Sequence, residues 1–307
     1  MAGAAVPVDL LNPGQVFACL GLMEAAEILC GPCEGGFDYR EFETQTTFAI
    51  HVAGADDPIA AVVKFLAGAE VKVLIPTGSD LSTKPWKIDV LATCEDGPAA
   101  DGHHFPSFPP ESPAALPIVL TDGRKQIPVD HWADGPACGR DNVKFWAGSA
   151  GYPGAALARD AIQVLQGLGD NALTDAAVDP FSLSAPQSSS FRFDWRRDYI
   201  PLDAGFSPNM HSSVRMVGYP LVELLAAIGL QHARPDRPDH RNKLAYRYGV
   251  SNLRLPTLFA RVVLGTQRLW SDPVRAFPIR IFRLRLGWPG QEGQARCIIN
   301  AQEEFTA

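Results

Sequence analysis

Three arginines surround one tryptophan in the segment 191–197, which reads FRFDWRR. Arginine carries a planar, permanently charged fork of donors that fits phosphate oxygens, and an indole ring can stack on a base. We therefore take Arg192, Trp195, Arg196 and Arg197 as candidate nucleic-acid contacts. The alternative is a core tryptophan with solvated arginine neighbours.

Five further residues join this candidate set. Asn209 and His211 follow a Ser-Pro turn and could reach a groove of nucleic acid, or they could simply cap a loop. Asn12 and Gln15 open a predicted helix whose free amides could hold a phosphate, although helix capping explains them equally well. Lys144 is the last candidate, next to a tryptophan that suits a protein core.

Charge is distributed unevenly along the chain, although the whole chain carries only −7. Residues 1–150 hold 9 basic and 20 acidic residues, whereas residues 151–307 hold 18 and 14. Within the second half, residues 191–285 hold 16 basic residues, 15 of them arginine, and 7 acidic ones. This asymmetry indicates a nucleic acid or an acidic partner, and arginines paired with surface carboxylates are the alternative. We expect nucleic acid to lie on the basic segment.

Common enzyme signatures are missing. The sequence has no GxxxxGK[ST], HExxH or GxSxG motif, and no GxGxxG after a predicted strand. The stretch 130–135 (DHWADG) sets His131 between two aspartates, which suits a general base or a hydrogen-bonded histidine in a polar turn. Because neither a nucleophile nor a metal partner accompanies it, we predict that the protein is not an enzyme.

The cysteines offer a second chemistry to weigh. Six cysteines are too few for a disulfide framework in a chain of this length. Cys30 and Cys33 form a CxxC pair, but the pair follows a helical pattern, and the C-terminal end of a helix disfavours a thiolate. A zinc site needs roughly four ligands, and only Cys94, His103 and His104 remain as partners. We therefore expect no metal and no cofactor, with a redox or zinc protein as the less favoured hypothesis.

The residue patterns predict helices and strands in irregular order. Asn12 and Pro13 suit the start of a helix that reaches Cys30, and Asp57-Pro58 starts a second helix, running to about residue 69. Further helices are predicted at 152–168, 220–229 and 255–264. Strands are predicted at 46–52, 71–75, 116–120, 126–129, 191–195, 278–286 and 295–301, with 143–146 as another short apolar piece. The absence of a regular βαβ series indicates an α+β fold.

Proline-rich residues from 76 to about 113 predict a long surface loop or insertion. The charge asymmetry suggests an acidic N-terminal region, 1–150, and a basic, arginine-rich region, 151–307, with one integrated domain as the alternative. No apolar run reaches the roughly 18 residues of a membrane span, and the N-terminus lacks the basic start of a secretory signal. We expect a cytoplasmic protein with no membrane partner.

Several phrases of the sequence together resemble one family. They lie at 7–31 (PVDLLNPGQVFACLGLMEAAEILCG), 35–38 (GGFD), 131–135 (HWADG), 143–148 (VKFWAG), 190–209 (SFRFDWRRDYIPLDAGFSPN) and 220–235 (PLVELLAAIGLQHARP). On these phrases the chain resembles the compact, Cas-eight-like large subunit of type I-U (also called I-G) CRISPR Cascade complexes. The resemblance spans nearly the whole chain, with 76–113 as its variable part.

This resemblance implies a non-catalytic subunit at the 5′ end of the CRISPR RNA, beside the backbone and Cas five-like subunits. It implies contact with the protospacer-adjacent motif in double-stranded target DNA, assistance in opening the R-loop, and recruitment of the helicase–nuclease. In such complexes the target DNA sequence is selected mainly by base pairing between the CRISPR RNA and the DNA. One departure is that the C-terminus predicts a strand pair where many large subunits carry a helical bundle, so we expect the bundle to be absent or supplied by separate small subunits.

Two expectations follow for experiment. If Arg196 and Arg197 contact phosphates, changing both to alanine weakens binding to target DNA and makes its salt dependence shallower. The main alternative function is an RRM-like endoribonuclease that processes repeat RNA with a histidine such as His131 or His211.

Overall fold

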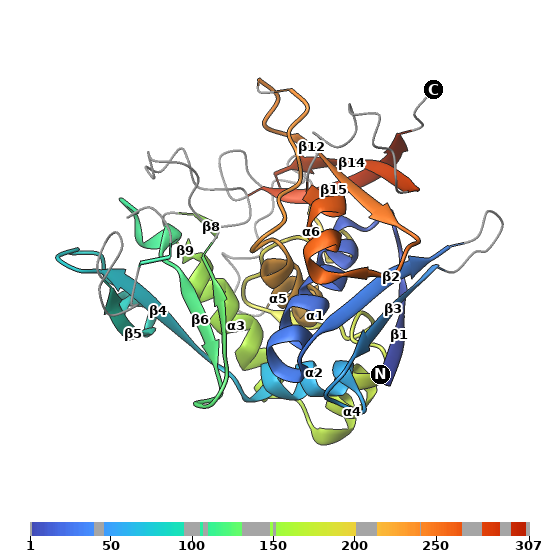
Figure 1. Cartoon of the computed structure of the whole chain (residues 1–307). Coiled ribbons are helices and arrows are strands. Elements are labelled where there is room, and N and C mark those ends of the chain that lie inside the picture. The colour runs from blue at the N-terminus through green and yellow to red at the C-terminus, as the bar shows by residue number, and fades with distance from the viewer. Residues whose placement is uncertain are drawn as a thin grey trace.

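The computed structural model describes residues 2–39, 46–94, 105–106, 110–130, 148–149, 152–200, 214–239, 241–265, 278–288 and 296–304. Small sheets surround a group of central helices, and strands and helices alternate irregularly along the chain (Figure 1). The α+β fold class predicted from the sequence is therefore confirmed.

Two apolar helices, α1 (Pro13–Cys30) and α5 (Pro220–Gly229), cross at the centre of the molecule (Figure 1). Each begins with proline, whose fixed φ and missing N–H suit the first turn. Helix α1 is long and apolar enough to cross a membrane, yet 83% of it is buried inside the protein. We therefore interpret α1 as the core helix of the fold.

The N-terminal sheet has the order β1-β3-β2-β13, and all of its neighbouring pairs are antiparallel. Only β3 was predicted from the sequence with its observed limits. The strands β1 and β2 were not predicted, because small residues and glycines weaken their alternating pattern. The four strands are β1 (Ala2–Val8), β2 (Cys33–Asp38), β3 (Thr46–Val52) and β13 (Leu255–Pro256).

A second sheet has the order β5-β4-β6-β7. Its strand β5 corrects the prediction of a long loop at 76–113, because Asp89–Cys94 pairs in parallel with β4. A short 3-10 helix, Lys84–Trp86, precedes it and another, Pro113–Ala115, precedes β6. The other strands are β4 (Glu70–Pro76), β6 (Ile118–Thr121) and β7 (Gln126–Val129), and the nearby helices are α2 (Pro58–Gly68), α3 (Gly154–Gln166) and α4 (Asp170–Val178).

The third sheet, which we call the C-terminal sheet, has the order β12-β14-β15 and lies at the top of the view in Figure 1. Its strands are β12 (Ala245–Ser251), β14 (Ile279–Gly287) and β15 (Cys297–Glu304), and α6 (Thr257–Gly265) packs beside β12. The predicted antiparallel pairing of the last two strands is confirmed. Two short pairs, β8 (Gly148–Ser149) with β9 (Tyr152–Pro153) and β10 (Ala185–Gln187) with β11 (Met216–Gly218), complete the sheets of the described residues.

One hydrophobic cluster joins the acidic and the basic regions. It runs from Val6 in β1 to Ile298 in β15 and includes the facing sides of α1 and α5. The ring of Tyr248 in β12 packs between Phe17 of α1 and Phe282 of β14, with ring centroids 5.5 and 5.4 Å apart. The two regions defined by charge therefore share a core in the part of the chain that the structure describes.

Candidate nucleic-acid interface

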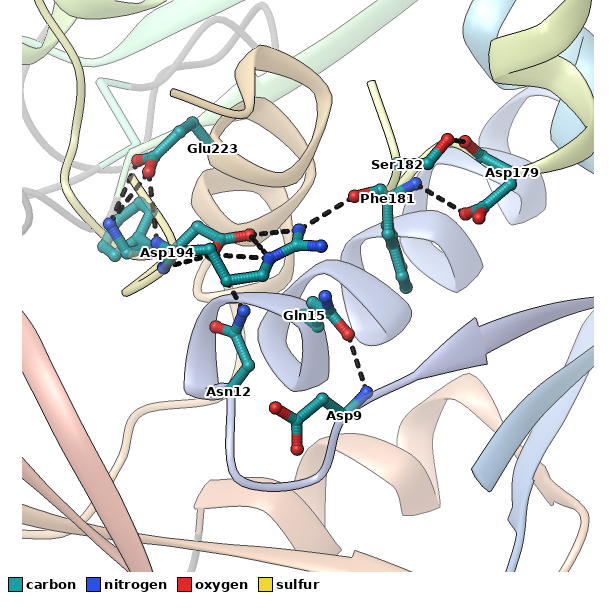
Figure 2. Close-up of polar contacts among 10 residues, drawn as sticks. Asp9, Asn12, Gln15, Asp179, Phe181, Ser182, Asp194 and Glu223 are labelled. Atoms are coloured by element: carbon teal, nitrogen blue, oxygen red, sulfur yellow. Dashed lines mark hydrogen bonds and ion pairs between the residues drawn. The ribbon is translucent and has the colours of Figure 1, made fainter. Parts of the chain in front are cut away.

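The segment 191–197 was predicted to include a strand at 191–195, and this prediction is wrong. Arg192 has a φ of 69°, in the left-handed region, which breaks an extended conformation. The segment instead crosses the first turns of α1 and α5 (Figure 2). A Cβ atom at Gly14, in the first turn of α1, would lie 2.7 Å from the carbonyl carbon of Phe193, so the two backbones touch.

Asp194 is the centre of the buried polar network that holds this segment. Its side chain is fully buried, and its Oδ1 accepts a 2.8 Å hydrogen bond from Asn12 Nδ2. The Arg196 guanidinium donates from Nε to Oδ1 at 3.0 Å and from Nη2 to Oδ2 at 2.6 Å, and the Arg196 backbone N–H also donates to Oδ1 (Figure 2). This fork-to-carboxylate geometry is the strong form of an ion pair.

Arg196 has two further internal contacts. Its Nη2 donates to the carbonyl oxygen of Phe181 at 2.8 Å, and its Cζ lies 3.8 Å from the ring centroid of Tyr219. Burial is the largest single influence on the pKa of Arg196 and lowers it, but the hydrogen bonds to Asp194 and the negative charge of that carboxylate together raise the pKa above its ordinary value. A phosphate would have to displace these partners, so contact between Arg196 and nucleic acid stays a prediction.

The two neighbouring arginines are also largely inside the protein. Arg197 is 8% exposed, and its Nη1 donates to the backbone oxygen of Asp198 at 3.0 Å. Burial, and then the nearby charge of Arg197, lowers the pKa of Arg192. Trp195 differs from both, because it is 41% exposed. Of the four candidates in this segment, Trp195 is therefore the one whose side chain is most open to a partner.

The candidates at the start of α1 take part in internal contacts. Asn12 occupies the predicted N-cap position but makes no side-chain capping bond, and its amide group donates to Asp194 instead. Gln15 is 4% exposed, and its Oε1 accepts a 2.7 Å hydrogen bond from the backbone N–H of Asp9 (Figure 2). Since the 193–194 backbone lies against this helix end, a phosphate there would also have to displace protein.

The remaining candidates, Lys144, Asn209 and His211, lie outside the described residues, as does His131. Their proposed roles stay predictions.

Glu223 extends the buried network to the first turn of α5. It is fully buried, and its carboxylate accepts 3.1 Å hydrogen bonds from the backbone N–H groups of Phe193 and Asp194 (Figure 2). Burial raises the pKa of Glu223 to about 7, against the two hydrogen bonds, which favour the charged form. Sequence reasoning missed this acid, because it lies within an apolar helical pattern that carries no signal for it.

The CxxC pair lies at the junction of α1 and β2, with Cys30 ending the helix and Cys33 starting the strand. Burial, with a smaller contribution from the charge of Glu27, raises the pKa of Cys33 to about 12, and burial also raises the pKa of Cys30. Such thiols are poor nucleophiles at neutral pH. Within the described residues, no group of three or more His, Cys, Asp or Glu side chains is placed to hold a metal ion.

The structure adds basic residues that the sequence analysis did not single out. Arg247, Arg283 and Arg285 lie on the face of the C-terminal sheet opposite to the buried Tyr248, Phe282 and Leu284. The alternation in 278–286 contains this signal, because Arg283 and Arg285 are two residues apart and so share one face of a strand.

Comparison of the sequence with protein-family models and curated proteins, and of the structure with solved structures, finds no match.

Proposed function

We propose that this chain is a non-catalytic subunit of a CRISPR RNA-guided DNA surveillance complex of type I-U or I-G, working in the cytoplasm. In this role it contacts the 5′ end of the CRISPR RNA and the double-stranded DNA at the protospacer-adjacent motif, beside the backbone and Cas five-like subunits. It assists R-loop formation and recruits the helicase–nuclease. The proposal includes no metal and no cofactor.

The observation that carries this proposal is the arginine excess of the basic region. An acidic protein that gathers 15 arginines within 191–285 has a region suited to polyanions despite its net charge of −7. Several of these side chains are exposed in the described structure, namely Arg215, Arg241, Arg254 and Arg285. The phrases that resemble the large-subunit family support the assignment to a CRISPR complex.

The sharpest test is reconstitution. The chain would be expressed with a CRISPR array and with the backbone, Cas five-like and helicase–nuclease genes of a type I-U or I-G system, using an affinity tag on a backbone subunit. We expect the chain to co-purify with the CRISPR RNA, and we expect its omission to abolish binding to double-stranded target DNA while leaving guide RNA in the remaining complex. A complex that binds the target equally well without this chain would contradict the proposal.

The non-catalytic part of the proposal has its own test. The purified chain would be incubated with repeat RNA in the presence of EDTA, and we expect the RNA to stay intact. Metal-independent cleavage that is lost in His131→Ala or His211→Ala would instead support the endoribonuclease alternative.

A further inference from the structure

The outer face of the C-terminal sheet carries arginines in a regular arrangement. On β14, Phe282 and Leu284 point into the core. Because successive side chains of a strand point to opposite faces, Arg283 and Arg285 point outward. Arg283 lies opposite Arg247 of β12 on one side and opposite Gln302 of β15 on the other. Arg285 in turn lies opposite Asn300. Three guanidinium groups and two carboxamide groups therefore share one face.

The charge of this face is positive even after its internal ion pairs are counted. The carboxylate of Glu304 pairs with both Arg247 and Arg283, and its Oε1 lies 2.5 Å from Arg283 Nε. Arg285 is exposed, and no acid among the described residues is paired with it. Asp236 forms an antiparallel bridge with Arg247 at the free edge of β12, which adds a second carboxylate on this side. Three positive charges therefore face two negative charges. At the same end of the sheet as Arg285, Arg296 donates from Nη1 to the backbone oxygen of Lys243 at 2.9 Å, which adds two cations.

The chemistry of the face selects a sugar–phosphate backbone rather than bases. Among the outward positions of the described strands none is aromatic, whereas single strands with splayed bases are bound by aromatic stacking. Arginine, glutamine and asparagine side chains are common donors to phosphate oxygens. Arg283 and Arg285 are spaced by about 7 Å along the strand, so they can reach different phosphates of one backbone.

We propose that the outer face of the C-terminal sheet, formed by Arg247, Arg283, Arg285, Asn300 and Gln302, binds the phosphate backbone of double-stranded DNA. The inference rests on the proposed function, because it names the surface by which the subunit holds the duplex beside its target. It places this contact on the C-terminal sheet and not on Arg196 and Arg197, whose guanidinium groups already bond within the protein.

The test measures binding of the purified full-length chain to a fluorescent 20-base-pair DNA duplex by anisotropy, at several salt concentrations from 50 mM to 200 mM. The double variant Arg283→Ala/Arg285→Ala removes two of the three arginines of the face and leaves Arg247 beside the carboxylates of Glu304 and Asp236. We expect binding at 50 mM salt to weaken by on the order of tenfold and the slope of log K against log salt to fall by about 2. Thermal melting would check that the variant is folded.

Two matched variants separate position from charge. Lys64→Ala/Arg124→Ala also removes two exposed cations, one on α2 and one in the β6–β7 turn, and we expect it to bind as the wild type does. Arg283→Lys/Arg285→Lys keeps the charge, and we expect it to keep the salt slope of DNA binding.

A further variant, Glu304→Gln, removes the carboxylate that pairs with Arg247 and Arg283. We expect it to bind the duplex more tightly, with a salt slope steeper by about 1.

Several outcomes would contradict the assignment of DNA binding to this face and would still leave the proposed function open. Reconstitution of the complex tests the proposed function separately. The contradicting outcomes are wild-type affinity in Arg283→Ala/Arg285→Ala, an equal loss in Lys64→Ala/Arg124→Ala, or no binding of the wild-type chain to the duplex at 50 mM salt. Tighter, Arg283-dependent binding to a single strand of the same length, or to an RNA duplex, would overturn the assignment to double-stranded DNA.

Discussion

The guanidinium of Arg196 and the fully buried carboxylate of Asp194 form a two-point ion pair, with Nη2 2.6 Å from Oδ2. The same carboxylate accepts from Asn12, which is 182 residues earlier in the chain. Because Glu223 holds the neighbouring backbone, this pair joins the first turns of α1 and α5 through the segment 191–197. The cluster that the sequence marked for nucleic acid is thus also a structural junction.

This junction predicts a stability effect for Arg196→Ala. Removing one partner leaves the Asp194 carboxylate buried with too little compensation, so we expect the free energy of unfolding to fall by about 3 kcal/mol. Urea unfolding followed by circular dichroism would measure it. Arg215→Ala, at an exposed position of the same basic segment, is the control and should change stability by less than about 0.5 kcal/mol.

The same junction changes what we expect of Arg196→Ala/Arg197→Ala. Because both guanidiniums have internal partners, loss of DNA binding should follow loss of folded protein, and the folded fraction should keep the wild-type salt slope. A folded double variant whose slope is shallower by about 2 would instead support the direct phosphate contacts predicted from the sequence.

Glu223 predicts a pH dependence of stability. Its pKa is raised from 4.5 to about 7 in the folded protein, so between these values the folded state holds a proton that the unfolded state releases. The contribution of this group to stability is therefore fully present below about pH 4.5 and is lost as the pH rises to about 7, with a total change of about 3 kcal/mol.

Glu223→Gln tests this dependence. The glutamine Oε1 can still accept from the N–H groups of Phe193 and Asp194, but the group no longer ionises. We expect the stability of the variant relative to wild type to rise by about 3 kcal/mol from pH 4.5 to pH 8, measured by urea unfolding at a series of pH values. A difference that stays constant over this range would contradict the assignment of the raised pKa to Glu223.

The sequence predicted those elements whose periodicity and end signals agree. Asn12-Pro13 and Asp57-Pro58 placed the starts of α1 and α2, and the alternation in 278–286 placed β14. Strand β5 was missed because the surrounding prolines and acidic residues suggested a loop, yet its backbone pairs with the edge of β4. The pairing of β5 with β4 depends on tertiary structure, and the residue pattern within β5 alone does not reveal it.

The candidate site was harder to predict, for a physical reason. The alternation of aromatic and charged residues in FRFDWRR matches a half-buried strand, but here Phe191 and Phe193 are both buried while Asp194 is buried as well. Charged residues can enter a core when partners from distant segments satisfy them, and Asn12 and Glu223 lie too far away in sequence to be recognised. Arg283 and Arg285 of β14, by contrast, face outward as simple alternation requires, whereas Arg280 has the parity of the buried Phe282 and Leu284.

The CxxC pair gives a chemical prediction. With a pKa of about 12, only about one Cys33 thiol in ten thousand is ionised at pH 8, and the side chain is 3% exposed. We expect Cys30 and Cys33 to stay unlabelled when the folded protein is treated with iodoacetamide at pH 8, and to be labelled when it is unfolded in urea. Peptide mass spectrometry would locate the label. Rapid labelling of Cys33 in the folded protein would revive the redox hypothesis.

The crossing of α1 and α5 depends on two glycines, and it predicts the largest effect of a single methyl group. A Cβ atom at Gly21 would lie 1.7 Å from the carbonyl oxygen of Leu225, and one at Gly229 would lie 2.1 Å from that of Phe17. Both obstacles are backbone atoms of a packed helix, so neither can move aside without separating the helices. We therefore expect Gly21→Ala to destabilise the protein by on the order of 3 kcal/mol, despite the higher helix propensity of alanine.

Gly68→Ala is the matched control for this prediction. Gly68 is the last residue of α2, and a methyl group added there would have no heavy atom from another part of the described structure within 4 Å. Alanine there should leave stability unchanged or raise it by up to about 1 kcal/mol, because it restricts the unfolded chain. Urea unfolding of the two variants beside the wild type would decide the matter. If Gly21→Ala unfolds at the wild-type urea concentration, α1 and α5 do not approach as closely as described.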